Sequence, residues 1–174
     1  ERAALRNLLR TDPYPVSEYL MQLEKERQID FQIVESTSKI LARKSVSDAE
    51  GFSARLRTSK GREHADAGIV GALAVKDKSL AADWLIAVKE RALWDQAIRV
   101  LVLESVLEDL EVAFNWFENI QDENVKASTL ERIGYKFGHS FGAEEGIRLL
   151  TRRRFNDAEW ELIHQGVEKA SQKN

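Results

Sequence analysis

The chain has 174 residues, of which 43% are apolar and 32% are charged, a composition typical of a folded globular protein rather than a disordered one. Its formal net charge of −3 argues against a general nucleic-acid-binding protein. The sequence has no cysteine, which excludes disulfides and thiolate metal sites, and no apolar run approaches the roughly 18 residues that a membrane span needs. Because the chain opens at Glu1 without a signal-like segment, we expect a piece of a longer protein, of unknown localisation.

The first predicted element is an amphipathic helix over residues 1–10, with Leu5, Leu8 and Leu9 on one face. It is either the tail helix of a preceding repeat or an N-terminal cap. Asp12 and Pro13 follow as the predicted N-cap and first residue of a second helix. These residues open a first helical pair over residues 12–44.

Further along the chain, apolar residues recur at an interval of 32 residues. Trp84 and Trp116 are one interval apart, and each has an alanine three residues before it and an aliphatic residue four after it. Leu101 and Ile133 are separated in the same way. Such a period is typical of helical-repeat arrays, in which each unit buries its apolar face against its neighbours. The sequence therefore predicts an all-α fold, an α/α superhelix (solenoid) of about five helical hairpins, forming a single domain over residues 1–174.

The remaining hairpins are expected at residues 47–76, 77–107, 109–138 and 140–170. Their helices should begin at capping residues, since Asp, Asn and Ser side chains accept hydrogen bonds from the first free backbone N–H groups. In the second hairpin we expect helices at about 48–58 and 62–76. In the first hairpin, Tyr19 and Leu23 are expected to line the core, one residue early relative to the later units. The predicted caps are Ser47 (with Glu50), a residue among 77–79, Asp95, Asp109, Asp122 or Asn124, and Asn156 (with Glu159).

The capped helix pairs, with Ala-x-x-Trp at Ala81–Trp84 and Ala113–Trp116, resemble the tetratricopeptide-like α/α superhelix class. The interval of 32 and the absence of closing prolines depart from the tetratricopeptide consensus. The pattern is closer to the Ala-x-x-Trp repeats of uncharacterised bacterial proteins. This resemblance implies a scaffold fold that binds proteins, with no catalytic residues to carry over.

The three histidines suggest no catalytic or metal site. Glu161 and His164 have the Glu-x-x-His spacing of di-iron bundles, but the sequence has no second copy of that motif. His64 lies between acidic residues at the start of a helix, where we expect it to be exposed. The glycines at 134, 138, 142 and 146 lack the strand and the Gly-Lys-Ser/Thr ending of a phosphate loop and are expected to allow close helix packing up to Gly138, followed by a turn. We expect no catalytic residue, no metal ligand and no cofactor.

Candidate partner-binding residues come from charge and from the tryptophans. Residues 39–62 are mainly basic and residues 100–125 contain acids but no lysine or arginine. Trp84 and Trp116 are expected in the core, whereas Trp94 lies outside their column. The sequence thus predicts a protein or peptide partner, contacted through Arg55, Arg57, Arg62, Trp94, Arg152, Arg153 and Arg154, with no role for nucleic acid. The alternatives for the arginine run are a helix-terminal role and nucleic-acid binding with a steep salt dependence. For the whole chain, the alternative is an enzyme or accessory domain with a site in the concave groove.

Overall fold

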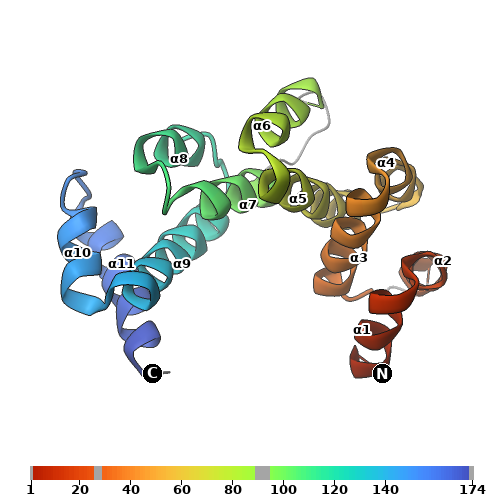
Figure 1. Ribbon diagram of the computed structural model, residues 1–174, viewed down its shortest axis with the longest axis horizontal. Helices are drawn as coiled ribbons and strands as arrows, with labels where there is room; N and C mark the ends of the chain where they lie inside the picture. Colours follow the sequence, from red (N-terminus) through yellow and green to blue (C-terminus); the bar gives the residue numbers. More distant parts are fainter. Residues whose placement is uncertain (1, 26–28, 89–94, 173–174) are drawn as a thin grey trace. The chain divides into compact units, whose positions relative to one another are not determined.

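The computed structural model describes residues 2–25, 29–88 and 95–172, and all the regular structure in these ranges is helical, without a strand (Figure 1). The predicted all-α class is therefore confirmed. The contacts divide the chain into two compact units, Glu1–Glu104 and Ser105–Asn174, which are described separately here.

The first unit is organised around two helices that lie side by side, α3 (Phe31–Lys44) and α5 (Ser59–Lys76). Shorter helices pack on this pair: α2 (Pro13–Lys25) contacts α3, α4 (Val46–Arg55) contacts both, and α6 (Lys78–Ala87) contacts α5. Helix α1 (Arg2–Thr11) lies against α2 and α3. The unit ends within α7 (Asp95–Ser105).

The second unit is organised around α9 (Glu123–Phe141), which packs along α11 (Asp157–Ser171) and against α10 (Ala143–Leu150). Helix α8 (Leu110–Phe117) precedes α9, and its Phe114 ring lies 5.3 Å from the ring of Phe155 in the segment before α11.

Five of the described helices, α2, α6, α8, α9 and α11, begin at predicted capping residues. The side chains of Asp12, Asp77, Asp109 and Asp122 each accept a hydrogen bond from a backbone N–H two or three residues later. Asn156 and Glu159 form the predicted capping box at α11. The expected cap at Ser47 is wrong, because α4 begins at Val46 and the hydroxyl of Ser45 accepts from the N–H of Asp48 at 3.2 Å. The second-hairpin helices thus start earlier than predicted.

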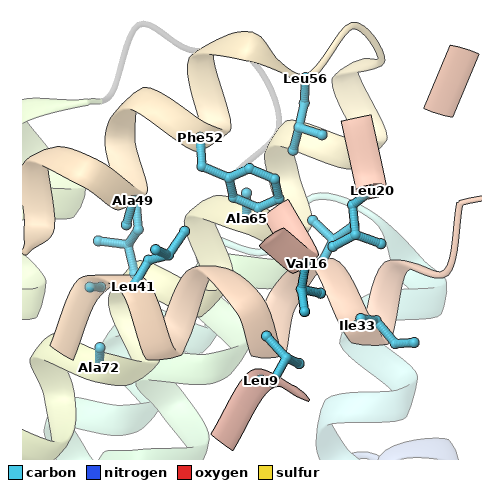
Figure 2. Packing of buried hydrophobic residues seen from close by; sticks show 13 residues of the cluster. Leu9, Val16, Leu20, Ile33, Leu41, Ala49, Phe52, Leu56, Ala65 and Ala72 are labelled. Atoms are coloured by element: carbon cyan, nitrogen blue, oxygen red, sulfur yellow. The ribbon is translucent and has the colours of Figure 1, made fainter. Parts of the chain in front are cut away.

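The core of the first unit is built from aliphatic and aromatic side chains of consecutive helices (Figure 2). Leu20 of α2, Leu41 of α3 and Phe52 of α4 are all at most 1% exposed. Figure 2 shows Phe52 and Leu56 beside Ala65 of α5, so the end of α4 is held against the start of α5. Burial of such side chains supplies about 1.5–3 kcal/mol each.

The buried face of α2 differs from the predicted one. Val16, Leu20 and Glu24 are buried, whereas Tyr19 and Leu23 are only half-buried. A shift of one residue rotates a helix face by about 100°. The buried Leu20 lies 32 residues before the buried Phe52, so the predicted one-residue offset of this helix is wrong. In α1, Leu9 is buried as expected but Leu8 is 42% exposed.

Trp84 and Trp116 are half-buried and not fully buried as their repeat position predicts, although Trp84 packs against the core of the first unit. Their neighbours Leu85 and Phe117 fill that place, at 1% and 2% exposure. The indole of Trp84 has a polar edge, and its Nε1–H donates to Glu50 Oε1 at 2.8 Å. A buried indole needs such a partner, and here it finds one at the rim of the core.

Close packing of α9 on α11 depends on glycine, as the Gly-x-x-x-Gly pattern indicates. A methyl group on Gly134 would overlap the carbonyl oxygen of Ile163, and one on Gly166 would overlap that of Glu131. Gly138 continues this contact against Val167. The following Gly142 has φ +82 and joins α9 to α10, a conformation that favours glycine.

Candidate functional site

Two of the three predicted arginines around the α4–α5 turn have intramolecular partners. Arg55 Nη1 donates to Glu18 Oε1 at 2.9 Å, and both side chains are more than half exposed. Arg62 Nη1 donates to the carbonyl oxygens of Leu56 and Arg57, at 2.8 and 3.2 Å. The exposed Arg57 side chain has no ion pair within the described part of the chain. Arg62 therefore stabilises the turn, and only Arg57 keeps its charge unmatched.

The arginine run does not end a helix, since α10 ends at Leu150 and the three residues follow in the turn. Arg153 has partners within the chain, since its guanidinium lies 4.4 Å from the centre of the Phe114 ring and 3.3 Å from Glu118 Oε1. Arg152 and Arg154 are exposed, and no described residue forms a hydrogen bond or an ion pair with either side chain. Arg153 therefore takes part in packing, whereas Arg152 and Arg154 face solvent.

Trp94 lies outside the described residues. The tryptophan of the second unit with the most aromatic neighbours is Trp160, whose ring lies 5.1 Å from Phe155 and 5.7 Å from His164. Trp160 is half-buried in this cluster, so its ring supports the start of α11.

A depression of about 420 Å³ lies between the start of α8, the end of α9 and α10 in the second unit. Its apolar lining includes Leu107 and Phe141, which are 38% and 44% exposed, a high fraction for such large apolar side chains. A second depression of about 380 Å³ adjoins it through Leu110 and Arg152, which line both. We call the two together the α8–α10 cleft. It is lined by Val106, Leu107, Glu108, Asp109, Leu110, Glu111, Phe137, Phe141, Leu149, Arg152 and Arg153.

Local backbone features position the helices that line the α8–α10 cleft. Asp109 caps α8 by accepting from the N–H of Val112 at 2.9 Å, which fixes the start of that helix. Gly142 turns the chain between α9 and α10. Gly146 allows α10 to approach α9 closely, because a methyl group there would lie 2.9 Å from the backbone of Phe137. These contacts hold Phe137, Phe141 and Leu149 around one apolar floor.

The charged side chains at the edge of the cleft differ in whether they already have a hydrogen-bond partner within the chain. The Asp109 carboxylate is used in capping α8. The charge of Arg152 acts on Glu145: hydrogen bonding to Arg148 lowers the pKa of that carboxyl, and Arg148 and Arg152 add an electrostatic contribution in the same direction. Since Arg152 has no hydrogen-bond acceptor of its own, it is the group at this edge that is free to bind an anion.

The sequence did not point to Leu107 and Phe141 as functional residues. The available signal was that both are large apolar residues next to helix ends, outside the columns that repeat every 32 residues. A large apolar side chain that the core does not use is a reason to look for a binding surface.

His64 is not the exposed histidine that the sequence predicts. Its side chain is 14% exposed, its ring is stacked on Phe31 at 5.1 Å, and Nδ1 lies 3.5 Å from Glu35 Oε2. The neighbouring Asp66 is instead bonded to the Ser53 hydroxyl at 2.6 Å. His64 therefore packs at the α3–α5 contact.

His164 is exposed on α11. In the described ranges, no group of three or more His, Asp or Glu side chains is placed to hold a metal ion. None of the described helices is both long enough and apolar enough to cross a membrane.

No family model matches the chain, and no curated protein or solved structure matches it significantly.

Proposed function

We propose that the chain is a helical-repeat scaffold that binds a protein or peptide partner. The observation that carries this proposal is the α8–α10 cleft, where Leu107 and Phe141 expose large apolar surfaces beside Arg152. Exposed apolar side chains beside charged groups in a depression are a combination that can bind a side chain of a partner.

Burial at intervals of 32 residues supports the repeat part of the proposal. At this interval one set of positions carries only small or medium residues, all of them buried: Ala42, Ala74, Val106, Gly138 and Ala170. A second set carries large aliphatic residues at its three middle positions, Ile69, Leu101 and Ile133, with Thr37 before them and Gln165 after them. Such recurring burial is what stacked helical units would produce. The tetratricopeptide-like pattern of Ala81–Trp84 and Ala113–Trp116 agrees with this interpretation, and scaffolds of that kind bind partners on exposed faces.

The proposal is tested by selecting binders from a displayed random-peptide library with the folded chain. We expect to select peptides that bind the parent chain but not the Leu107→Asp variant, because a carboxylate in the cleft would disfavour an apolar side chain there. Val75→Asp is the matched control, since Val75 is 60% exposed on α5 and lies outside the cleft. If no peptide is selected, or if the selected peptides bind Leu107→Asp as well as the parent, the proposal is wrong. Far-ultraviolet circular dichroism checks that both variants keep their helices.

A further inference from the structure

We infer that the α8–α10 cleft recognises a peptide segment in which a bulky apolar side chain stands next to a carboxylate, with Arg152 binding the carboxylate. This inference depends on the proposed function and adds the chemistry of its ligand.

The apolar part of the ligand follows from the floor of the cleft. Phe137 and Val106 are buried beneath it, at 4% and 1% exposure, while Leu107 and Phe141 stand partly in solvent at its sides. A volume of about 420 Å³ accommodates one or two large side chains, and covering the two exposed residues removes apolar surface from water.

The anionic part follows from the difference between the neighbouring arginines. Arg153 already lies over Phe114 and beside Glu118, so its charge is matched within the chain. Arg152 lines both depressions and has no acceptor among the described residues. A guanidinium offers paired N–H groups with the geometry of a carboxylate, and such bonds are stronger than those between neutral groups.

A single carboxylate fits this site better than a nucleic-acid backbone. Glu108, Asp109 and Glu111 line the same cleft, so a row of phosphates that approached Arg152 would also meet three acidic side chains. An isolated carboxylate needs only one guanidinium as its partner, whereas a row of phosphates needs several cations. A lone unpaired arginine among acidic residues therefore suits a peptide with one carboxylate at this point better than a polyanion.

The test uses three capped tetrapeptides, acetyl-Glu-Leu-Phe-Glu-amide and its counterparts with glutamine or lysine at both ends. Each is titrated to millimolar concentration while amide chemical shifts are followed by NMR. We expect the glutamate peptide to shift the amides of residues 106–110, 141 and 149–152, with a Kd roughly fivefold to tenfold lower than that of the glutamine peptide. The lysine peptide should bind more weakly than either.

Arg152→Gln should remove the preference and bring the glutamate peptide to the affinity of the glutamine peptide. Arg154→Gln is the control, because Arg154 is also exposed but does not line the cleft, and it should leave the preference unchanged. These variants change surface side chains, so both are expected to fold, and their spectra check this directly.

Three outcomes would overturn the inference. Equal binding of the glutamate and glutamine peptides at the cleft, or tighter binding of the lysine peptide, would remove the anion preference and leave the proposed function intact. Binding of a thymidine oligonucleotide at Arg152 that displaces the glutamate peptide would assign the arginine to phosphate. Absence of any shift at the cleft would mean that these residues do not bind peptides of this class, whereas the library selection with Leu107→Asp decides the proposed function independently.

Discussion

The carboxylate oxygen Oε1 of Glu24 accepts hydrogen bonds from both the backbone N–H and the hydroxyl of Thr58, at 3.0 and 2.6 Å, although the two residues are 34 positions apart. Oε2 accepts the N–H of Arg57 at 2.6 Å. Glu24 is only 5% exposed, so a buried carboxylate of α2 satisfies the donors of the turn between α4 and α5. This contact ties the end of α2 to the turn between α4 and α5.

Replacing Glu24 by glutamine should lower the free energy of unfolding by about 1–3 kcal/mol, because the amide nitrogen cannot accept the N–H of Arg57. Glu18→Gln on the same helix is the control. Its ion pair with Arg55 is mostly exposed, and such pairs contribute at most about 1 kcal/mol. Urea denaturation followed by circular dichroism measures both. Equal losses in the two variants would contradict the structural role of Glu24.

The contribution of Glu24 should also depend on pH. Burial opposes the charged form, but the hydrogen bonds from Thr58 and Arg57, together with the charge of Arg62, outweigh it and lower the pKa of Glu24. A carboxyl whose pKa is lower in the folded state stabilises the fold above its unfolded pKa of about 4.3, and this contribution is lost as the pH falls through the folded pKa. The stability difference between the parent and Glu24→Gln should therefore be full at pH 7 and shrink below about pH 4.3. A difference that is constant from pH 7 to pH 3 would contradict this assignment.

Phe52→Ala should cost more stability than Trp84→Ala. Phe52 is 0% exposed, and truncating a buried aromatic side chain typically costs about 3–5 kcal/mol. Trp84 is half-buried, so less of its surface returns to water, although the loss of its bond leaves Glu50 without that donor. Urea denaturation of the two variants measures the difference, and a larger loss for Trp84→Ala would mean that α6 packs differently.

Gly134→Ala should destabilise the second unit by several kcal/mol or force α9 and α11 apart, since the added methyl group would overlap the carbonyl of Ile163. Gly51→Ala is the matched control. Gly51 is also inside a helix, but a methyl group there meets nothing within 4 Å, so the substitution should be neutral or stabilising by up to about 1 kcal/mol. Thermal unfolding distinguishes the two, and similar melting temperatures would argue against close packing at Gly134.

The sequence predicted the helical class and the starts of five helices, because capping depends on residues two or three positions away. Asp77, Asp109 and Asp122 illustrate this. The predicted cap at Ser47 was wrong. Ser45 and Ser47 stand close together in the sequence, and the backbone geometry makes Ser45 the cap of α4. Local patterns therefore locate a helix to within a few residues.

The candidate site was mostly beyond sequence reasoning. Arg152, Arg153 and Arg154 form one basic run in the sequence, but only the fold brings Phe114 and Glu118 to Arg153 and leaves Arg152 at an apolar cleft. His64 and Trp84 show the same limit, since each is amphipathic and its burial is decided by residues about 30 positions away. Contacts at that range depend on side-chain packing, which periodicity alone does not specify.

In both units, side-chain hydrogen bonds between successive hairpins join residues 33 to 38 positions apart, as in Glu24–Arg57, Glu50–Trp84, Glu118–Arg153 and Glu131–Lys169. Each of these contacts closes a loop of similar, moderate length, so none of them requires distant ends of the chain to meet. Under the proposed repeat architecture, folding could therefore start at any neighbouring pair of hairpins and spread outward. Fraying of a hairpin at one end would then leave the bonds of the others unbroken, and a chain that gained or lost one 32-residue segment would keep the same local interactions.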